Sequence, residues 1–245
     1  MVEKNGSSIL VIIAALNEEE GIGPTLAEVK DNLDSPLCLV IDGHSADNTV
    51  KIAKAMGAKV ISQKGEGKGD AIATAILQSK SLNTEYAALI DADFTYPAEY
   101  LPRMIELLEK DPETGMVCGN RFNGGSDEGA MSGMFDSGNR LLTMTHSLLN
   151  SVGLTDPLTG LRVIRWKTLR EWQPRSKGFD IEVELNCYIA KKGYKIAEIP
   201  IRYRARLGEK KLKMRHGFTV LRRIMLESLA YLSEIESKHG VRGPG

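Results

Sequence analysis

The sequence has few cysteines and no long apolar run. The cysteines, Cys38, Cys118 and Cys187, are odd in number, far apart and without a CxxC pair. Such a set argues against a disulfide framework and a cysteine zinc site, and it indicates a reducing compartment. The longest apolar run, residues 9–16, has eight residues, whereas a membrane span needs about 20. A signal peptide is not indicated either, because the polar residues 17–20 follow where small cleavable residues would stand.

The sequence also lacks a net charge and several catalytic spacings. Its 32 basic residues balance 32 acidic residues, which argues against a protein dedicated to nucleic acid. The histidines at positions 44, 146, 216 and 239 show neither HxxxH nor HExxH spacing, so zinc chemistry has no support. The chain has no GxSxG, no Walker pattern and no GxGxxG after the first apolar run. A hydrolase triad and a dinucleotide-binding fold are therefore not indicated.

The pattern that is present is that of a globular α/β protein. Apolar residues make up 42% of the 245 residues and charged residues 26%, so the chain can bury a full core. Short apolar runs alternate with helical patterns, which predicts a mainly parallel sheet with helices on both faces. The predicted strands are 9–14, 37–41, 59–61, 87–90, 116–118, 161–164 and 195–199. The predicted helices are 18–32, 46–56, 70–80, 98–109, 139–150 and 181–192.

Two carboxylates follow directly on a predicted strand. Asp91 and Asp93, with Ala92 between them, come after the run 87–90, at the strand end where open α/β sheets bind ligands. Carboxylates so close repel each other unless a cation lies between them. Their hard oxygen atoms suit Mg²⁺ or Mn²⁺ bridging to a substrate diphosphate. We therefore predict that Asp91 and Asp93 are metal ligands rather than two acids on a surface loop.

Two further loops have features of a nucleotide site. Asp42 ends an apolar strand and can accept a hydrogen bond from a base or ribose, while Ser45 or Asp47 is expected to cap the following helix. The loop 64–70 has three glycines and two lysines. Its backbone can approach a nucleotide closely and a lysine can neutralise phosphate, although a plain flexible loop explains it equally well.

Taken together, these segments resemble the family 2 glycosyltransferases of GT-A fold, and among them the dolichol-phosphate mannose synthase-like enzymes. The resemblance extends over about residues 9–215 and rests on seven segments in order. Each segment alone is weak, but the ordered set is specific. They are 15–18 (ALNE), 42–45 (DGHS), 91–93 (DAD), 119–122 (GNRF), 156–162 (DPLTGLR), 178–185 (GFDIEVEL) and 206–212 (RLGEKKL).

The resemblance implies a single GT-A, or nucleotide-diphospho-sugar transferase, domain and a role for each matching residue. Asp91 and Asp93 would hold the metal, Mg²⁺ or Mn²⁺, on the donor diphosphate. Arg121 would bind the acceptor phosphate, with Arg140 as the nearest candidate for a second acceptor arginine. Thr95 stands where the mannose synthases often have glutamine. Because of this departure, the resemblance does not supply a third metal ligand. The expected donor site comprises Leu16, Asn17, Glu18, Asp42, Gly43, Lys68, Asp70, Ala92, Arg206 and Lys211.

The implied reaction is inverting, metal-dependent transfer of a hexose from GDP-mannose, UDP-glucose or UDP-GlcNAc to a polyprenyl (dolichyl) phosphate. A phosphate monoester is largely ionised at neutral pH, since its second pKa is about 6. Such an acceptor can attack the sugar without a general base, and the protein needs only a metal and cations. Catalysis is accordingly assigned to Asp91, Asp93 and Arg121.

Other functions remain open at this point. A related glycosyltransferase could act on a hydroxyl of a glycan or small metabolite, with Asp180 as the base. A nucleotidyltransferase is disfavoured, because the acidic run 17–20 follows the first strand where a glycine-rich, basic signature is usual. A non-catalytic nucleotide-binding protein is the third class.

The last part of the chain carries a block of one charge and an apolar stripe. Residues 202–223 hold nine lysines and arginines against one acid, Glu209, which predicts docking of a polyanion. An apolar stripe at helical spacing follows, namely Phe218, Leu221, Met225, Leu229, Leu232 and Ile235.

We expect one GT-A domain over residues 1–215. Residues 216–245 form an amphipathic helix and tail that belongs to this domain or docks on a membrane or a second subunit. For such a stripe, packing on the chain's own sheet or on a second subunit is the usual outcome. A lipid-linked acceptor instead favours peripheral, salt-sensitive association with the cytoplasmic face of a membrane, in an otherwise cytoplasmic protein. A homo-oligomer is left open, and nucleic acid is not expected as a partner.

Overall fold

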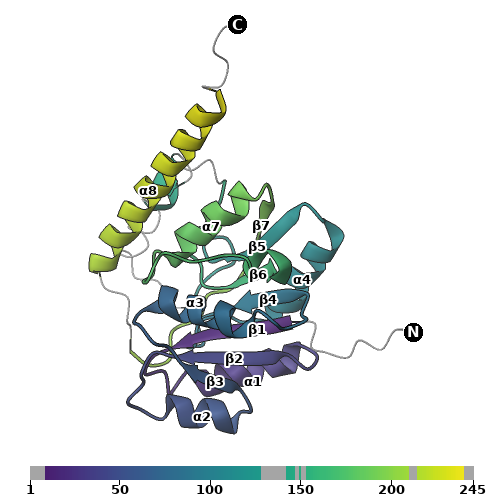
Figure 1. The fold of residues 1–245 in the computed structure, drawn as a ribbon. Coiled ribbons are helices and arrows are strands. Elements are labelled where there is room, and N and C mark those ends of the chain that lie inside the picture. Colours follow the sequence, from purple (N-terminus) through teal and green to yellow (C-terminus); the bar gives the residue numbers. More distant parts are fainter. Residues whose placement is uncertain (1–8, 128–141, 147–148, 150–152, 210–213, 240–245) are drawn as a thin grey trace, which may run out of the picture.

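The computed structural model describes residues 9–127, 142–146, 149, 153–209 and 214–239. It confirms an α/β domain built on one sheet of seven strands in the order β3-β2-β1-β4-β6-β5-β7 (Figure 1). All neighbouring strands are parallel except β6, which runs antiparallel to β4 and β5. The strands are β1 (Ile9–Ala15), β2 (Leu37–Asp42), β3 (Lys59–Ser62), β4 (Tyr86–Leu89), β5 (Thr114–Asn120), β6 (Arg162–Arg165) and β7 (Lys195–Pro200).

Helices cover both faces of the sheet because the central strands are apolar on both sides. Alternate residues of β1 enter two separate cores. Ile9, Val11 and Ile13 pack with helices on one face, and Leu10 and Ile12 pack with helices on the other. The first face carries α1 (Ile22–Asn32), α2 (Thr49–Ala55) and α4 (Leu101–Lys110), and the second carries α3 (Lys68–Ser79), α6 (Trp166–Leu169) and α7 (Ile181–Lys191).

The predicted elements form where the sequence places them, and the main differences lie at helix starts. The helix predicted from residue 18 begins at Ile22, and the helix predicted from residue 46 begins at Thr49. In both cases the preceding polar residues form turns, because their backbone amides donate to side chains across the neighbouring loop. Ser45 therefore caps no helix, and the N-cap of α2 is Asn48. Of the helix predicted over 139–150, residues 142–146 are described and helical, and most of the rest lies outside the described residues.

The long helix α8 (Met214–His239) lies beside α7 and extends past the rest of the domain (Figure 1). Val220 and Ile224 are buried against Val183 of α7. Phe218, Met225 and Leu229 of the predicted apolar stripe are instead exposed. An apolar stripe at helical spacing usually packs on the chain's own domain. These three residues do not. The side chains of Leu232 and Ile235 lie outside the described part of the chain.

One glycine of α1 is required by space rather than by backbone conformation. Gly21 is the N-cap of α1 with φ of −96°, which any residue can adopt. A Cβ on Gly21 would lie 2.5 Å from the carbonyl oxygen of Ala92 and 2.7 Å from Cα of Asp93. The start of α1 can therefore pack directly on the backbone of the Asp91-Ala92-Asp93 segment.

We expect Gly21→Ala to lower the free energy of unfolding by about 1–3 kcal/mol, the usual cost of overpacking, since the contacting atoms are backbone. Denaturant unfolding measures the change. Gly217→Ala is the matched control, because Gly217 lies in α8 and a Cβ added there would meet no atom within 4 Å; it should leave stability unchanged or raise it. Equal stability of the two variants would contradict the close approach.

Candidate active site

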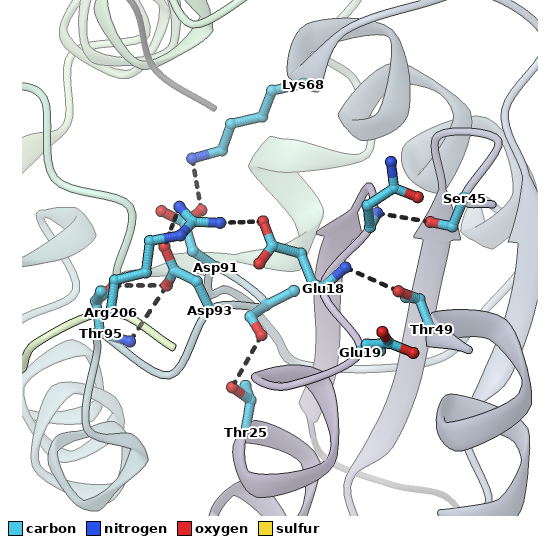
Figure 2. A network of polar contacts seen from close by, with 12 residues as sticks. Glu18, Glu19, Thr25, Ser45, Thr49, Lys68, Asp91, Asp93, Thr95 and Arg206 are labelled. Atoms are coloured by element: carbon cyan, nitrogen blue, oxygen red, sulfur yellow. Dashed lines mark hydrogen bonds and ion pairs between the residues drawn. The ribbon is translucent and has the colours of Figure 1, made fainter. Parts of the chain in front are cut away.

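The candidate site lies at the carboxyl ends of β1, β2 and β4. The segment after β4 carries Asp91 and Asp93, the loop after β1 carries Glu18, and the last residue of β2 is Asp42. Because these three strands are parallel neighbours, their ends meet at one edge of the sheet. Sequence reasoning predicted this edge, and the structure brings Asp91, Asp93, Glu18, Lys68 and Arg206 into one polar network there (Figure 2).

Lys68, the first residue of α3, joins Asp91 to Glu182 of α7. Its Nζ lies 2.7 Å from Oδ1 of Asp91 and 2.7 Å from Oε1 of Glu182. Burial alone would lower the pKa of Lys68, but the charges of Asp91 and Glu182 outweigh it and raise the pKa above its usual value. Lys68 is therefore a permanent cation between two carboxylates. Among the described residues, Oε2 of Glu182 has no hydrogen-bond partner.

Arg206 comes from the segment after β7 and pairs with the second carboxylate. Its Nη1 lies 2.9 Å from Oδ2 of Asp93, and its Nη2 bonds Oε1 of Glu18. Thr95 donates to Oδ1 of Asp93 from its hydroxyl, at 2.6 Å, and from its backbone amide, at 3.2 Å. Burial and the neighbouring charge of Asp91 nevertheless raise the pKa of Asp93. The negative charge of Asp93 is therefore only partly compensated by Arg206 and Thr95.

The Arg206 segment is fixed by its backbone as well. The amide of Leu207 donates to the carbonyl oxygen of Asp93 at 3.1 Å, and the amide of Arg204 donates to that of Thr95 at 3.0 Å. Arg204 also forms a two-nitrogen pair with Glu28 of α1, at 2.6 and 2.8 Å. A segment more than 100 positions away in sequence is therefore held along the residues that follow β4.

The turn after β2 is tied to the turn after β1. The carboxylate of Asp42 accepts the backbone amides of His44 and Ser45, at 3.2 and 3.1 Å. Asn17 donates its amide to Oγ of Ser45, and the side chain of Asn17 accepts the amide of Ala46. Asp42 was expected to accept from a base or ribose, and the structure shows it organising its own turn. Leu16, at the end of the β1 run, is exposed beside Gly43.

The glycine-rich loop 64–70 packs against the residues before α7 rather than standing free. A Cβ on Gly67 would lie 2.4 Å from the carbonyl oxygen of Lys177, and the amide of Gly69 donates to the same oxygen at 2.9 Å. Asp70 accepts the amide of Gly65 at 3.0 Å. Asp70 therefore closes its own loop, and Lys68 is the loop residue that faces Asp91.

Arg121 is buried in a pair with Asp156 at the end of β5. Its Nε and Nη2 each lie 2.7 Å from an oxygen of Asp156, whose side chain is fully buried. Burial would lower the pKa of Arg121, but the neighbouring Tyr96 and Asp156 keep it raised. The ring of Tyr203 lies 5.4 Å from the guanidinium. Two nitrogens of the predicted acceptor residue thus already have a partner.

An aromatic pair connects Arg121 with the Asp91 region. Tyr203 meets Tyr96 edge to face at 5.2 Å, and the hydroxyl of Tyr96 accepts the amide of Gly160 at 2.7 Å. A Cβ on Gly160 would lie 2.4 Å from Oδ2 of Asp91. Contacts through these residues therefore join the Asp91 region, predicted for the donor, to the Arg121 region, predicted for the acceptor.

Four arginines of the basic block 202–223 pair with acids from outside the block. Arg202 lies 2.7 Å from Asp127, and Arg204 and Arg206 pair with Glu28 and with Glu18 and Asp93. Arg223 of α8 pairs with Asp180, Glu184 and Glu227. Docking of a polyanion on this block stays a prediction, and these four arginines already have acidic partners. Arg140 and Lys211, both predicted site residues, lie outside the described residues.

Two parts of the network were missed by sequence reasoning. Glu182 belongs to the segment 178–185 but received no role, and Glu18 was assigned to a nucleotide rather than to Arg206. Asp180, Glu182 and Glu184 alternate along the start of α7, and their contacts differ although Arg223 pairs with both Asp180 and Glu184. Glu184 holds Ser176, Asp180 holds Arg223, and Glu182 alone reaches Lys68. The alternation itself was visible in the sequence.

The residues present fit a divalent cation of the Mg²⁺ type. Within the described chain, no group of three or more histidine, cysteine, aspartate or glutamate side chains is arranged to hold a metal. Asp91 and Asp93 form a pair of carboxylates instead, and Mg²⁺ commonly takes one or two carboxylates together with substrate phosphates and water. Burial and the neighbouring charge of Asp91 raise the pKa of Asp93, and a bound cation would favour its ionised form.

Comparison with known proteins gives the family. Residues 10–169 match the profile described as glycosyl transferase family 2. The chain is 34% identical over 214 residues to a dolichyl-phosphate hexose transferase of Haloferax volcanii, which covers 86% of this chain and 90% of that protein. It is 28% identical over 218 residues to an undecaprenyl-phosphate mannosyltransferase of Micrococcus luteus, covering 83% of this chain and 87% of that protein.

A solved structure shares the fold. Glucosyl-3-phosphoglycerate synthase of Mycobacterium tuberculosis, in complex with Mn²⁺, UDP and glucosyl-3-phosphoglycerate, matches with a TM-score of 0.68 at 20% identity, covering 98% of this chain and 82% of that chain. The chain belongs to glycosyl transferase family 2 and is a glycosyltransferase by class. The predicted family, GT-A fold and enzyme class are thereby confirmed.

We expect Lys68→Met to lower the free energy of unfolding by about 3 kcal/mol, because it leaves the buried carboxylate of Glu182 and the half-buried one of Asp91 without their shared cation. Denaturant unfolding measures the loss. Lys64→Met, in the same loop but not in the network, is the matched control. Adding Glu182→Gln to Lys68→Met should restore part of the stability, and a strictly additive double variant would contradict the shared pair.

Proposed function

We propose that this protein transfers a hexose from a nucleotide sugar to a polyprenyl phosphate, with inversion at the anomeric carbon and with Mg²⁺ or Mn²⁺ as cofactor. The observation that carries the proposal is the pairing of Asp91 and Asp93 with Lys68 and Arg206 at the carboxyl end of the sheet. The names of the relatives from Haloferax volcanii and Micrococcus luteus, a dolichyl-phosphate and an undecaprenyl-phosphate transferase, support the acceptor class.

On the donor side, the network supplies both charges that a metal–diphosphate group requires. Asp91 and Asp93 would hold the cation, which when bound would stabilise the negative charge of the leaving diphosphate. Lys68 and Arg206 lie within bonding distance of those carboxylates, so they are placed to contact phosphate oxygens. Leu16 and the turns 15–18 and 42–46 offer an exposed apolar side chain and ordered backbone beside this point, where the base and ribose would lie.

On the acceptor side, the chemistry asks for positive charge rather than a base. A phosphate monoester is already ionised near neutral pH, since its second pKa is about 6. Its oxygen can attack the anomeric carbon while the bond to the diphosphate breaks. Arg121, which is adjacent to the Tyr96–Tyr203 pair, is the candidate that orients this phosphate.

The candidate base of the hydroxyl-acceptor alternative already has a partner in the fold. Asp180 was this candidate, and Oδ2 of Asp180 lies 3.0 Å from Nε of Arg223. A carboxylate held in this way serves to position α8 against α7. Transfer to a phosphate needs no replacement for it, so the geometry favours the phosphate acceptor.

The proposal includes reversible attachment to the cytoplasmic face of a membrane, where a polyprenyl phosphate is held. No helix in the described part of the chain is long and apolar enough to cross a bilayer.

The proposal is tested by transfer from a panel of labelled donors, GDP-mannose, UDP-glucose and UDP-GlcNAc, to a short-chain polyprenyl phosphate with Mn²⁺. We expect one donor to label the lipid phosphate. Transfer to water or to a sugar hydroxyl, with no lipid-linked product from any donor, would contradict it.

Asp93→Asn should abolish transfer while the protein remains folded, since the variant removes one charged oxygen from the proposed metal pair. The measurement is the rate of lipid-linked product, with circular dichroism as the test of fold. Asp34→Asn, at an exposed position outside the network, is the control and should keep the full rate. Undiminished transfer in excess chelator would refute the metal requirement.

Asp180→Asn should retain at least about a tenth of the wild-type rate, because general-base catalysis, typically worth 10²–10⁴-fold, is not used with an ionised acceptor. The amide oxygen of asparagine can still accept from Arg223. A fall by several hundredfold, with donor binding and fold intact, would instead support a hydroxyl acceptor.

A further inference from the structure

The helix α8 presents two different faces along its length. Val220, Ile224 and Glu227, spaced by four and three residues, are buried on the side that meets α7. The opposite face, here called the outer face, consists of Phe218, Arg222, Met225, Leu226 and Leu229, all of them exposed. Phe218 is 77% exposed and Leu229 is 62% exposed, which is unusual for large apolar side chains gathered on one helix.

The orientation of α8 about its own axis is fixed by a buried ion cluster. Arg223 lies 3.0 Å from Asp180, 3.7 Å from Glu184 and 3.5 Å from Glu227. The ring of Phe179 contacts that of His216 at 5.0 Å near the start of the helix. Because Arg223 is adjacent in sequence to Arg222 but points toward α7, this cluster turns the outer face away from the domain.

Over residues 216–230, whose side chains the structure describes, the charge of the outer face has one sign. Arg222 is its charged member, and the only acid of α8 between residues 216 and 230, Glu227, is 3% exposed on the opposite side. The sequence itself contains no acidic residue from 210 to 226. A face that is apolar along its centre and basic in charge complements an anionic lipid surface. A second copy of the same face would bring like charges together, which costs free energy.

The outer face is also linked to the proposed active site through the chain. Leu207 donates to the carbonyl oxygen of Asp93, and α8 begins at Met214, seven residues later. Seven residues span at most about 25 Å. A second connection runs through α7. Asp180 pairs with Arg223 of α8. Two residues further on, Glu182 pairs with Lys68, which also pairs with Asp91.

We propose that the outer face of α8 is a docking surface for an anionic lipid bilayer, and that the Arg223 cluster holds α8 in the orientation that exposes it. The inference rests on the proposed lipid-phosphate acceptor for its purpose and on the exposure and charge of the outer face for its placement. Phe218, Met225 and Leu229 enter the boundary between headgroups and acyl chains, while Arg222 contacts anionic headgroups.

The test is flotation of the full chain with phosphatidylcholine vesicles, with and without phosphatidylglycerol. We expect the wild-type protein to float with the anionic vesicles at low salt and to be released by salt. The triple variant Phe218→Ser, Met225→Ser, Leu229→Ser should bind about 100-fold more weakly, from the apolar area it removes. Arg222→Gln should weaken binding to the anionic vesicles about fivefold and should leave binding to the phosphatidylcholine vesicles unchanged.

The matched control is Leu77→Ser on α3, an apolar side chain that is 64% exposed but outside α8, and it should float like the wild type. Circular dichroism should show that all variants keep the fold, since only exposed side chains change. Wild-type protein that stays unbound at low salt, or a triple variant that floats as well as the wild type, would overturn the proposal.

Analytical sedimentation tests whether a second copy of the chain, rather than a bilayer, covers the outer face. Concentration-dependent dimers that the triple variant abolishes, without vesicle binding by the wild type, would assign the outer face to a second copy and overturn the proposal. Transfer to a water-soluble short-chain polyprenyl phosphate is measured in parallel. That activity needs no bilayer, so failure of docking is distinguishable from failure of the proposed function.

Discussion

The site depends on the cost of keeping two carboxylates close together, one of them, Asp93, buried and the other, Asp91, half-buried. Asp91 and Asp93 follow an interior strand, where their charges are poorly screened and repel each other. Lys68 and Arg206 offset this repulsion, because Lys68 pairs with Asp91 and Arg206 pairs with Asp93. The start of α3 and the segment after β7 have to reach the end of β4 for this to happen. Much of the loop structure at this edge of the sheet follows from that requirement.

The same arrangement explains why the site suits a metal–diphosphate group. Asp91 and Asp93 would hold a divalent cation, and Lys68 and Arg206 would then have phosphate oxygens as alternative partners. Binding of such a group would replace ion pairs within the protein by ion pairs with the ligand, so no charged group would be left without a partner. Glu18 and Glu182 are the second partners of the two cations, so Arg206 and Lys68 remain paired if Asp91 and Asp93 turn to a metal.

The sequence was sufficient for the strands and the carboxylate pair, but not for their partners. Apolar runs identify the strands because the sheet is covered on both faces, and Asp91 and Asp93 are visible at the end of one of them. The pair of Arg206 with Glu18 joins residues 188 positions apart, and nothing in local periodicity specifies such a contact. The basic block 202–223 shows the same limit, since the acids that pair with Arg202 and Arg204, Asp127 and Glu28, come from distant segments. The starts of α1 and α2 were misplaced for a related reason, because turns held across two loops compete with helix formation there.

The central claim is that Asp91 and Asp93 bind a divalent cation together with a nucleoside diphosphate. Electron paramagnetic resonance of Mn²⁺ titrated into the protein tests it directly, in the presence and absence of GDP or UDP. We expect Mn²⁺ to bind much more tightly when the cognate diphosphate is present, and Asp91→Asn with Asp93→Asn to remove this binding while the fold persists. Unchanged Mn²⁺ binding in that double variant would contradict the claim.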